Sequence, residues 1–193
     1  MEALVKALKQ SPDYDQHDEV ETRVKVTKLN YLKTFYRLQA FQGWDRASVD
    51  ETSIDFFHNG NVRTTIDANK QVVGHVAKTV KHACTVNVAH PFVKDIKASH
   101  AREEPVLAVD EFVKALDWVR KKTRSEFVYA DFSYVFTIVQ EGRTLAEAAA
   151  AKRTYEIEVE QTFPAKRKRD AYTLAESFLM KAKAMFPGLE CEG

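Results

Sequence analysis

Polar and apolar residues alternate in two stretches of the chain, HDEVETRVKV (residues 17–26) and TYEIEVEQ (residues 154–161). Alternate side chains of a β-strand point to opposite faces, so each stretch would carry its charges on one face. In the first stretch these charges are Glu19, Glu21, Arg23 and Lys25. In the second they are Glu156, Glu158 and Glu160, with Ile157 and Val159 on the opposite face. The pattern predicts two strands that each have a charged and an apolar face.

Shorter runs of β-type residues predict the remaining strands. They cover residues 53–57, 61–67, 71–80, 82–88, 95–101 and 131–140. The turn sequences HNGN at 58–61 and DANK at 67–70 separate the first three of these runs. Roughly eight strands joined by few helices indicate an antiparallel sheet that is closed or strongly curved.

Helical patterns occur in four segments. Residues 30–42 and 170–186 predict amphipathic helices, with Asn30 and Asp170 as candidate N-caps. The first ten residues and the alanine-rich residues 141–153 predict shorter helical segments. We expect the two longer helices to pack outside the sheet, against the apolar faces of the strands.

The composition is that of a globular protein. The chain has 193 residues, of which 45% are apolar and 30% are charged, and we expect one domain over residues 1–193 with residues 1–16 as an N-terminal lead-in. The net charge of +1 argues against a broad basic surface for nucleic acid. Cys84 and Cys191 lie in no disulfide or zinc motif, and no apolar run is long enough to span a membrane. We therefore expect a cytosolic or nuclear protein that binds no membrane.

The two rows of glutamates are candidate ligands for a divalent metal ion. Such an ion takes several hard oxygen ligands, and neighbouring strands lie about 4.8 Å apart, so carboxylates of facing strands can reach one ion. The alternative explanation is a sheet face exposed to solvent, which also alternates between charged and apolar residues.

A row of basic residues lies in WVRKKTRSEF, residues 118–127, where Arg120, Lys122 and Arg124 occupy alternate positions. If the segment is extended, the three cations share one face; a solvated loop or the last turn of a helix is the alternative. Acidic and basic faces inside a closed sheet would be costly unless a metal ion binds one and an anion the other. Arginine and lysine both bind phosphate oxygens, so the combination indicates a phosphate chain and a metal ion as ligands.

The order of the motifs resembles that of the metal-dependent, tunnel-type RNA triphosphatases. EVETRVK is similar to the first acidic strand of the family, and NVRTTID and HVAKTV are similar to its central strands. DIKASHAREEPV resembles the strand that ends in a glutamate before proline, WVRKKTRSEFVY the RxKxR strand, and YEIEVE the last acidic strand. The resemblance runs from Asp18 to Ala184, and its specificity comes from the order and spacing of six weak motifs.

This resemblance implies the fold and the activity. The fold would be a closed antiparallel eight-stranded β-barrel (a triphosphate tunnel), mainly β, with helices packed outside. The activity would be hydrolysis of the γ-phosphate from the 5′ end of triphosphate-ended RNA, the first step of mRNA cap formation, with Mn²⁺ or Mg²⁺ as cofactor. It also implies cleavage of nucleoside triphosphates as a side activity, an RNA guanylyltransferase as a candidate partner, and a nuclear location (cytoplasmic for a viral protein).

The resemblance also implies roles for individual residues. Metal ligands would be Glu19, Glu21 and Glu160, and Glu158 would orient or activate the attacking water. Glu156 would support the basic wall, and Glu103 would be a further essential carboxylate. Phosphate would be bound by Arg63, Lys78, Arg120, Lys122 and Arg124. For Arg63, Lys78 and Glu103 the resemblance carries the assignment, because their local sequence has no distinctive pattern.

Two positions depart from the family pattern, and two other functions stay open. Val135 stands where the family often has an acidic residue, and Lys97 stands where arginine is common. Related tunnels act on inorganic tripolyphosphate or organic triphosphates, and they usually carry ExExK where this chain has EVETR. A non-enzymatic β-sheet binding module, with its charges in solvent, is the second alternative. The run AKRKR at 165–169 fits a nuclear signal, an RNA contact or a solvated loop.

Overall fold

The computed structural model describes four long parts of the chain, residues 18–58, 61–90, 93–107 and 116–162. It also describes the short pieces 5–6, 13–14, 167–168, 173, 176–177, 180–181 and 190–191. Most of the predicted C-terminal helix, most of the first ten residues and most of the AKRKR run lie outside the described residues, so these predictions are not tested. Every helix in the described part of the chain is too short or too polar to cross a lipid bilayer.

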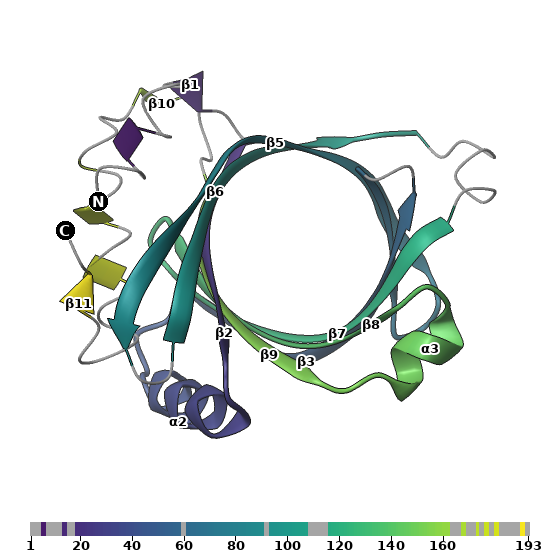
Figure 1. Cartoon of the computed structure of the whole chain (residues 1–193), viewed down its shortest axis with the longest axis horizontal. Coiled ribbons are helices and arrows are strands. Elements are labelled where there is room, and N and C mark those ends of the chain that lie inside the picture. Colours follow the sequence, from purple (N-terminus) through teal and green to yellow (C-terminus); the bar gives the residue numbers. More distant parts are fainter. Residues whose placement is uncertain are drawn as a thin grey trace.

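Eight antiparallel strands form a closed barrel, as the resemblance implied (Figure 1). Around the ring the order is β5, β4, β3, β7, β8, β9, β2 and β6, and β6 pairs again with β5. The bounds are β2 Asp18–Val26, β3 Arg46–His58, β4 Val62–Asp67, β5 Val72–His90, β6 Val93–Pro105, β7 Leu116–Tyr129, β8 Phe132–Gly142 and β9 Thr154–Thr162. Because the ring closes, every one of these strands has two neighbours, and alternate side chains point into the barrel.

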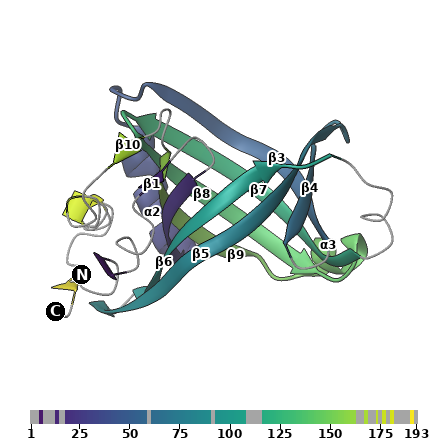
Figure 2. The same ribbon diagram turned by 90° about the horizontal axis from the view of Figure 1, so that it is seen from above.

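In the described part of the chain, three very short strands lie outside the ring. Strand β1 (Asp13–Tyr14) pairs with β10 (Arg167–Lys168) in a separate sheet. Strand β11 (Glu190–Cys191) adds to one edge of β5. Figure 2 shows β1 and β10 beside the barrel, on the same side as the helix over residues 28–39.

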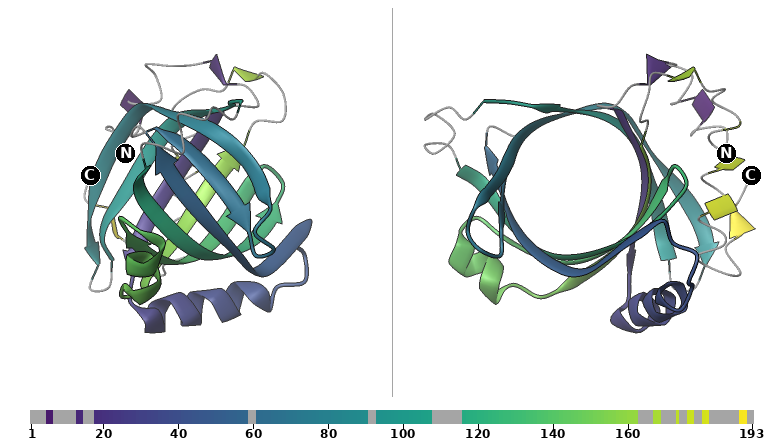
Figure 3. Two further views of the ribbon diagram at one scale, coloured as in Figure 1. Left: turned by 90° about the vertical axis from the view of Figure 1, so that its right-hand side faces the viewer. Right: turned by 180° about the vertical axis from the view of Figure 1, so that it is seen from behind.

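The helix α2 (Lys28–Gln39) covers the outer face of the barrel, as predicted (Figure 3). Its buried face includes Tyr31 and Phe35, whose rings each lie 5.5 Å from the ring of Phe136 on β8. The core under this helix includes Ile157 and Val159, the apolar residues between the glutamates of β9. The prediction that these two residues face the outer packing is therefore confirmed.

The start of α2 differs from the prediction. Thr27, not Asn30, is the N-cap, and the Thr27 hydroxyl accepts a hydrogen bond from the backbone N–H of Asn30 at 3.3 Å. The helix therefore begins at Lys28 and ends three residues earlier than expected. The physical reason is that a threonine oxygen at the strand–helix junction already satisfies a free N–H of the first turn.

The alanine-rich segment forms the predicted short helix, α3 (Leu145–Ala150), between β8 and β9. Thr144 caps it by accepting a hydrogen bond from the N–H of Glu147, and the Glu147 carboxylate accepts one from the N–H of Arg143. Two backbone donors at the start of the helix are thus satisfied by side chains.

Strands β5 and β3 are longer than the sequence predicted, and both contain a bulge. The runs at 71–80 and 82–88 form one strand, β5, with a register shift between Val80 and His82 that takes up the break in the pattern. Strand β3 begins at Arg46, not Ser53, and has a register shift between Ser48 and Glu51. Such bulges insert a residue without ending the pairing, so a broken alternation was misleading at both sites.

Candidate active site in the barrel interior

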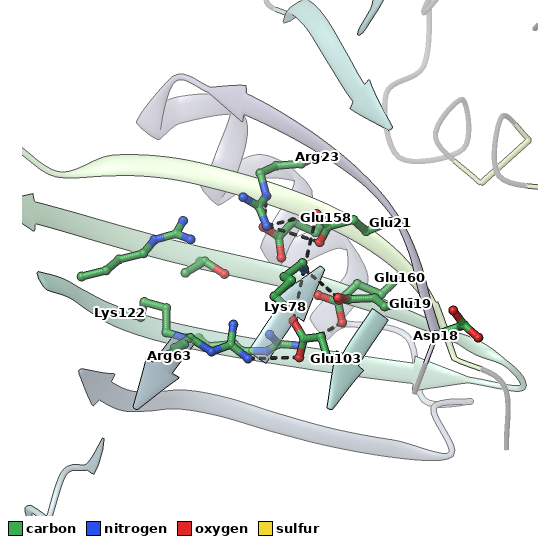
Figure 4. Close-up of a pocket in the computed structure, with 13 residues that line it drawn as sticks. Asp18, Glu19, Glu21, Arg23, Arg63, Lys78, Glu103, Lys122, Glu158 and Glu160 are labelled. Atoms are coloured by element: carbon green, nitrogen blue, oxygen red, sulfur yellow. Dashed lines mark hydrogen bonds and ion pairs between the residues drawn. The ribbon is translucent and has the colours of Figure 1, made fainter. Parts of the chain in front are cut away.

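The charged faces of the strands line a cavity of about 270 Å³ inside the barrel (Figure 4). The basic residues that line it are Arg23, Arg63, Lys78, Arg120, Lys122 and Arg124. The acidic residues that line it are Asp18, Glu19, Glu21, Glu103, Glu158 and Glu160. The residues that the sequence singled out for metal, phosphate and water are thus brought together, with the exception of Glu156, which contacts the wall from beside the cavity.

Three carboxylates gather at one place in this cavity. Glu19, Glu21 and Glu160 each offer an oxygen, and these atoms lie within 4.8 Å of one another. The register pairs Glu21 directly with Glu160 across β2 and β9. Burial raises the pKa of Glu160 well above its ordinary value, and burial also raises the pKa of Glu19 although Lys78 opposes it. A divalent ion would stabilise the charged forms of all three, and these hard oxygen donors fit Mg²⁺ or Mn²⁺.

The ammonium of Lys78 lies among these acidic side chains. Its Nζ is 2.8 Å from Glu19 Oε2, 3.2 Å from Glu103 Oε1 and 3.9 Å from Glu21 Oε1. Burial would lower the pKa of Lys78, but these carboxylates outweigh it and the pKa is raised. For Glu21, burial is outweighed by Arg23 and Lys78, so its pKa is lowered. Lys78 therefore supplies positive charge to the acidic cluster.

Arg23 forms ion pairs with two of the glutamates. Its guanidinium contacts Glu158 and lies 3.3 Å from Glu21 Oε2. Glu21 also accepts a hydrogen bond of 2.9 Å from the Ser99 hydroxyl. The sequence assigned no role to Arg23, although its position in the alternating row, two residues after Glu21, already placed it on the inner face.

The RxKxR segment is extended, so its three cations do share the inner face of the barrel. Strand β7 carries all of them, which excludes the loop and the helix turn. Arg124 lies 3.0 Å from Glu160, and Arg120 contacts Glu156 and lies 3.1 Å from Glu141. Glu156 thus touches the basic wall, the position that the resemblance implied.

Lys122, the central cation of this row, pairs with a carboxylate that the sequence did not single out. Its Nζ lies 2.6 Å from Asp55 Oδ2, and Asp55 is 1% exposed. Thr65 donates a hydrogen bond of 2.8 Å to the same carboxylate. Burial lowers the pKa of Lys122, and the ion pair with Asp55 only partly opposes this. A lone acidic residue inside the apolar run SIDFF was the available signal.

Arg63 and Glu103, which the sequence placed by resemblance alone, meet on one wall of the cavity, on the two strands that flank β5. Arg63 on β4 lies 3.1 Å from Glu103 on β6 (Figure 4). Burial would raise the pKa of Glu103, but Arg63 and Lys78 outweigh it and the pKa is lowered. Glu103 therefore links two of the proposed phosphate-binding side chains.

Three further residues near the cavity are Val135, Lys97 and Asp18. Val135 is fully buried and pairs directly with Glu158, so an apolar side chain occupies the place of the acidic residue that is frequent in the family. Lys97 is exposed and lies opposite Arg23. Asp18 lies apart from the carboxylate cluster (Figure 4) and pairs with Lys81 at 2.5 Å.

The cavity is therefore self-neutralised, since each of its basic side chains pairs with a carboxylate. Removing a partner from a buried pair leaves an uncompensated charge, which is costly. A polyanion could bind the basic side chains in place of the carboxylates. The carboxylates would then need another cation to neutralise them. The arrangement can thus hold a phosphate chain and a divalent metal ion together.

Comparison with known proteins identifies the fold. No family model matches the sequence, and no curated protein sequence matches it. The structure of the S. pombe Pct1 RNA triphosphatase matches with a TM-score of 0.71 at 15% identity, over 94% of this chain and 88% of that chain. The RNA triphosphatase domain of the trifunctional mimivirus mRNA capping enzyme matches with a TM-score of 0.69 at 16% identity, over 95% of both chains. The chain therefore has the fold of these RNA triphosphatases.

The same barrel also occurs in a different assembly. A chain of the Schizosaccharomyces pombe Mediator head module matches with a TM-score of 0.55 at 11% identity, over 91% of this chain and 96% of that chain. The fold is thus not confined to structures of triphosphatases. What such a barrel can bind therefore depends on the side chains inside it.

Proposed function

We propose that the protein is a metal-dependent RNA 5′-triphosphatase, which hydrolyses the bond between the β- and γ-phosphates at the end of triphosphate-ended RNA. The observation that carries this proposal is the acidic cluster of Glu19, Glu21 and Glu160 facing the basic row of β7 across one cavity. This pairing, within the fold of two RNA triphosphatases, supports a polyphosphate substrate. The product would be a diphosphate end, ready for guanylyl transfer, so a guanylyltransferase is the proposed partner.

Glu19, Glu21 and Glu160 would hold the metal ion, because their oxygens converge and are hard donors. When bound, Mn²⁺ or Mg²⁺ neutralises charge on the phosphate chain and polarises its phosphorus–oxygen bonds. Lys78 would contribute to the same neutralisation, because its ammonium contacts Glu19 and Glu103.

The basic wall would bind and orient the triphosphate. Arg120 and Arg124 are planar forks that suit two phosphate oxygens, and Lys122 between them acts as a point charge. Arg63 and Lys78 face the same cavity from β4 and β5. Phosphoryl transfer depends mainly on such positioning and on charge stabilisation, so these five cations would supply most of the rate.

Glu158 would position the attacking water and accept its proton. The oxygen of the water attacks the γ-phosphorus, the bond to the bridging oxygen breaks, and the RNA leaves with a diphosphate end. Arg23 holds the Glu158 carboxylate in place through their ion pair. Glu156 and Glu103 would act by positioning Arg120 and Arg63, which they contact directly.

A tripolyphosphatase is the second candidate, because the cavity would bind the triphosphate in the same way without RNA. The experiment that separates them measures phosphate release from γ-labelled triphosphate-ended RNA and from inorganic tripolyphosphate, with Mn²⁺, with Mg²⁺ and with EDTA. Release from RNA that requires the metal supports the proposal. Rapid cleavage of tripolyphosphate with no release from RNA would move the protein to the second candidate, and no cleavage of either would favour a binding module.

A further inference from the structure

A second pocket, of about 330 Å³, opens beside the cavity and shares Glu21 and Arg23 with it. Its other walls come from β5 and β6, which Figure 1 shows continuing together past the ring of the barrel. Thr85 and Ser99 contribute hydroxyls to this lining, and Lys97 contributes an ammonium group. The size lies within the range of small-molecule sites, and the walls combine polar groups with small apolar ones.

Two positive charges face each other in this pocket. Arg23 and Lys97 are directly paired across β2 and β6, and like charges at such positions repel. Glu158 and Glu21 balance Arg23. Lys97, by contrast, is exposed and forms no ion pair within the described residues. Thr85 is paired with Lys97 from the other side, on β5. The pocket thus offers an anion a hydroxyl and a cation that has no carboxylate partner among the described residues.

The ion pairs show in which direction this pocket lies. Arg124 pairs with Glu160, which belongs to the acidic cluster, and Arg120 pairs with Glu156, four residues before Glu160 on β9. The basic row of β7 therefore extends from the metal ligands toward Glu156. On β2 the residue paired with Glu160 is Glu21, so Arg23 lies further in the same direction.

Lys97 lies further from the acidic cluster than Ser99 does, in that same direction. Ser99, two residues from Lys97 on β6, donates its hydroxyl to Glu21 in the acidic cluster. Lys97 itself is paired with Arg23, the next inward residue of β2. A phosphate chain that starts at the acidic cluster and follows the basic row would have its nucleoside end near this pocket.

We propose that the pocket holds the first nucleotide of the RNA chain, with the Lys97 ammonium bound to the phosphodiester that follows it. This inference rests on the proposed function, because it concerns the part of the substrate that lies beyond the triphosphate. The pocket thereby distinguishes RNA from tripolyphosphate, which has no nucleotide and ends before Lys97. The basic row binds the triphosphate, which both substrates contain, and the second pocket binds the nucleotide, which only RNA contains.

The test is a binding measurement on the full chain with two ligands. One is a short RNA whose 5′ triphosphate has a methylene group between the β- and γ-phosphates, so that it is not cleaved; the other is inorganic tripolyphosphate. We expect Lys97→Ala to weaken RNA binding about three- to tenfold and to reduce the slope of log K against log salt concentration by about 0.7, as for one lost contact with single-stranded RNA. Tripolyphosphate binding should be unchanged.

Two further variants make the test specific. Lys121→Ala is the matched control, because Lys121 lies between Arg120 and Lys122 on β7 and its side chain points to the opposite face of the strand. It should leave the binding of both ligands unchanged. Ala83→Phe should fill the pocket without changing its charge, and should weaken RNA binding alone.

Equal weakening of both ligands by Lys97→Ala would overturn the inference, since Lys97 would then belong to the triphosphate site. Unchanged RNA binding in both Lys97→Ala and Ala83→Phe would also overturn it. If either of these results is obtained and the wild-type chain cleaves triphosphate-ended RNA, only the role of the second pocket is rejected and the proposed function stands. A wild-type chain that cleaves tripolyphosphate but neither binds nor cleaves the RNA would reject both.

Discussion

The ammonium of Lys78 lies 2.8 Å from Glu19 Oε2, beside the carboxylates that we assign to the metal ion. One side chain thus contacts a proposed metal ligand and also lines the cavity proposed for phosphate. Without a metal ion, Lys78 balances part of the acidic charge. When a metal ion and a phosphate chain bind together, the same ammonium can turn to the phosphate, so the two ligands should favour each other's binding.

Lys78→Met should therefore raise the affinity for Mn²⁺ in the absence of phosphate, because a competing positive charge is removed. We expect a gain of about tenfold, equivalent to ~1.4 kcal/mol, and a loss of tripolyphosphate affinity in the same variant. Calorimetric titration of each ligand measures both effects. Lys121→Met, on the other face of β7, is the control. Weaker Mn²⁺ binding by Lys78→Met would contradict the assignment of the metal ligands.

The buried pair of Asp55 and Lys122 gives a prediction about stability. Asp55→Ala should lower the free energy of unfolding by about 3–5 kcal/mol, because Lys122 is left buried without its partner. Tripolyphosphate should restore part of the loss, since it supplies a new partner for Lys122. The double variant Asp55→Ala/Lys122→Ala should be more stable than Asp55→Ala alone. Urea unfolding of the three proteins measures this, and equal stability of the single and double variants would contradict it.

The lowered pKa of Glu103 predicts that the stability of the fold depends on pH. Its pKa in the folded chain lies below the ordinary 4.5 because Arg63 and Lys78 outweigh the effect of burial. A lowered pKa means that the carboxylate stabilises the fold above pH 4.5 and that this contribution is lost as the pH falls through the lowered value. Glu103→Gln should thus be less stable than wild type at neutral pH, by about 1–3 kcal/mol. The difference should shrink below pH 4.5.

Thermal unfolding of wild type and Glu103→Gln across this pH range measures the effect. Glu104→Gln is the control, because Glu104 is exposed and pairs with Arg102 away from the cavity. A stability difference for Glu103→Gln that stays constant from neutral to acid pH would contradict the ion pairs described for this residue.

The sequence predicted the inner face of the barrel well, for a simple reason. Strict alternation determines which side chains share a face, so Glu19, Glu158 and Arg120 could be assigned to one side before any pairing was known. The same alternation placed Ile157 on the outer face, where it packs below α2. The local sequence pattern was therefore sufficient to predict which face of a strand each of these residues occupies.

The partners inside the cavity could not be predicted in the same way. Lys122 meets Asp55 because β3 and β7 become neighbours in the ring, and Lys78 on β5 meets Glu19 on β2 across the single strand β6. These contacts depend on pairings between segments far apart in the chain. The length of β5 was missed because a bulge looks like a strand end in the sequence.

The most direct test of the account follows two labels on the same RNA, one at the α- and one at the γ-phosphate, in wild type, Glu160→Ala and Arg124→Ala. With Mn²⁺ or Mg²⁺, wild type should release the γ-label as phosphate and leave the α-label on a diphosphate end, and EDTA should stop the reaction. Both variants should remain folded, as circular dichroism can check, and should lose the release. Normal turnover by folded Glu160→Ala would contradict the proposed metal site and, with it, the proposed mechanism.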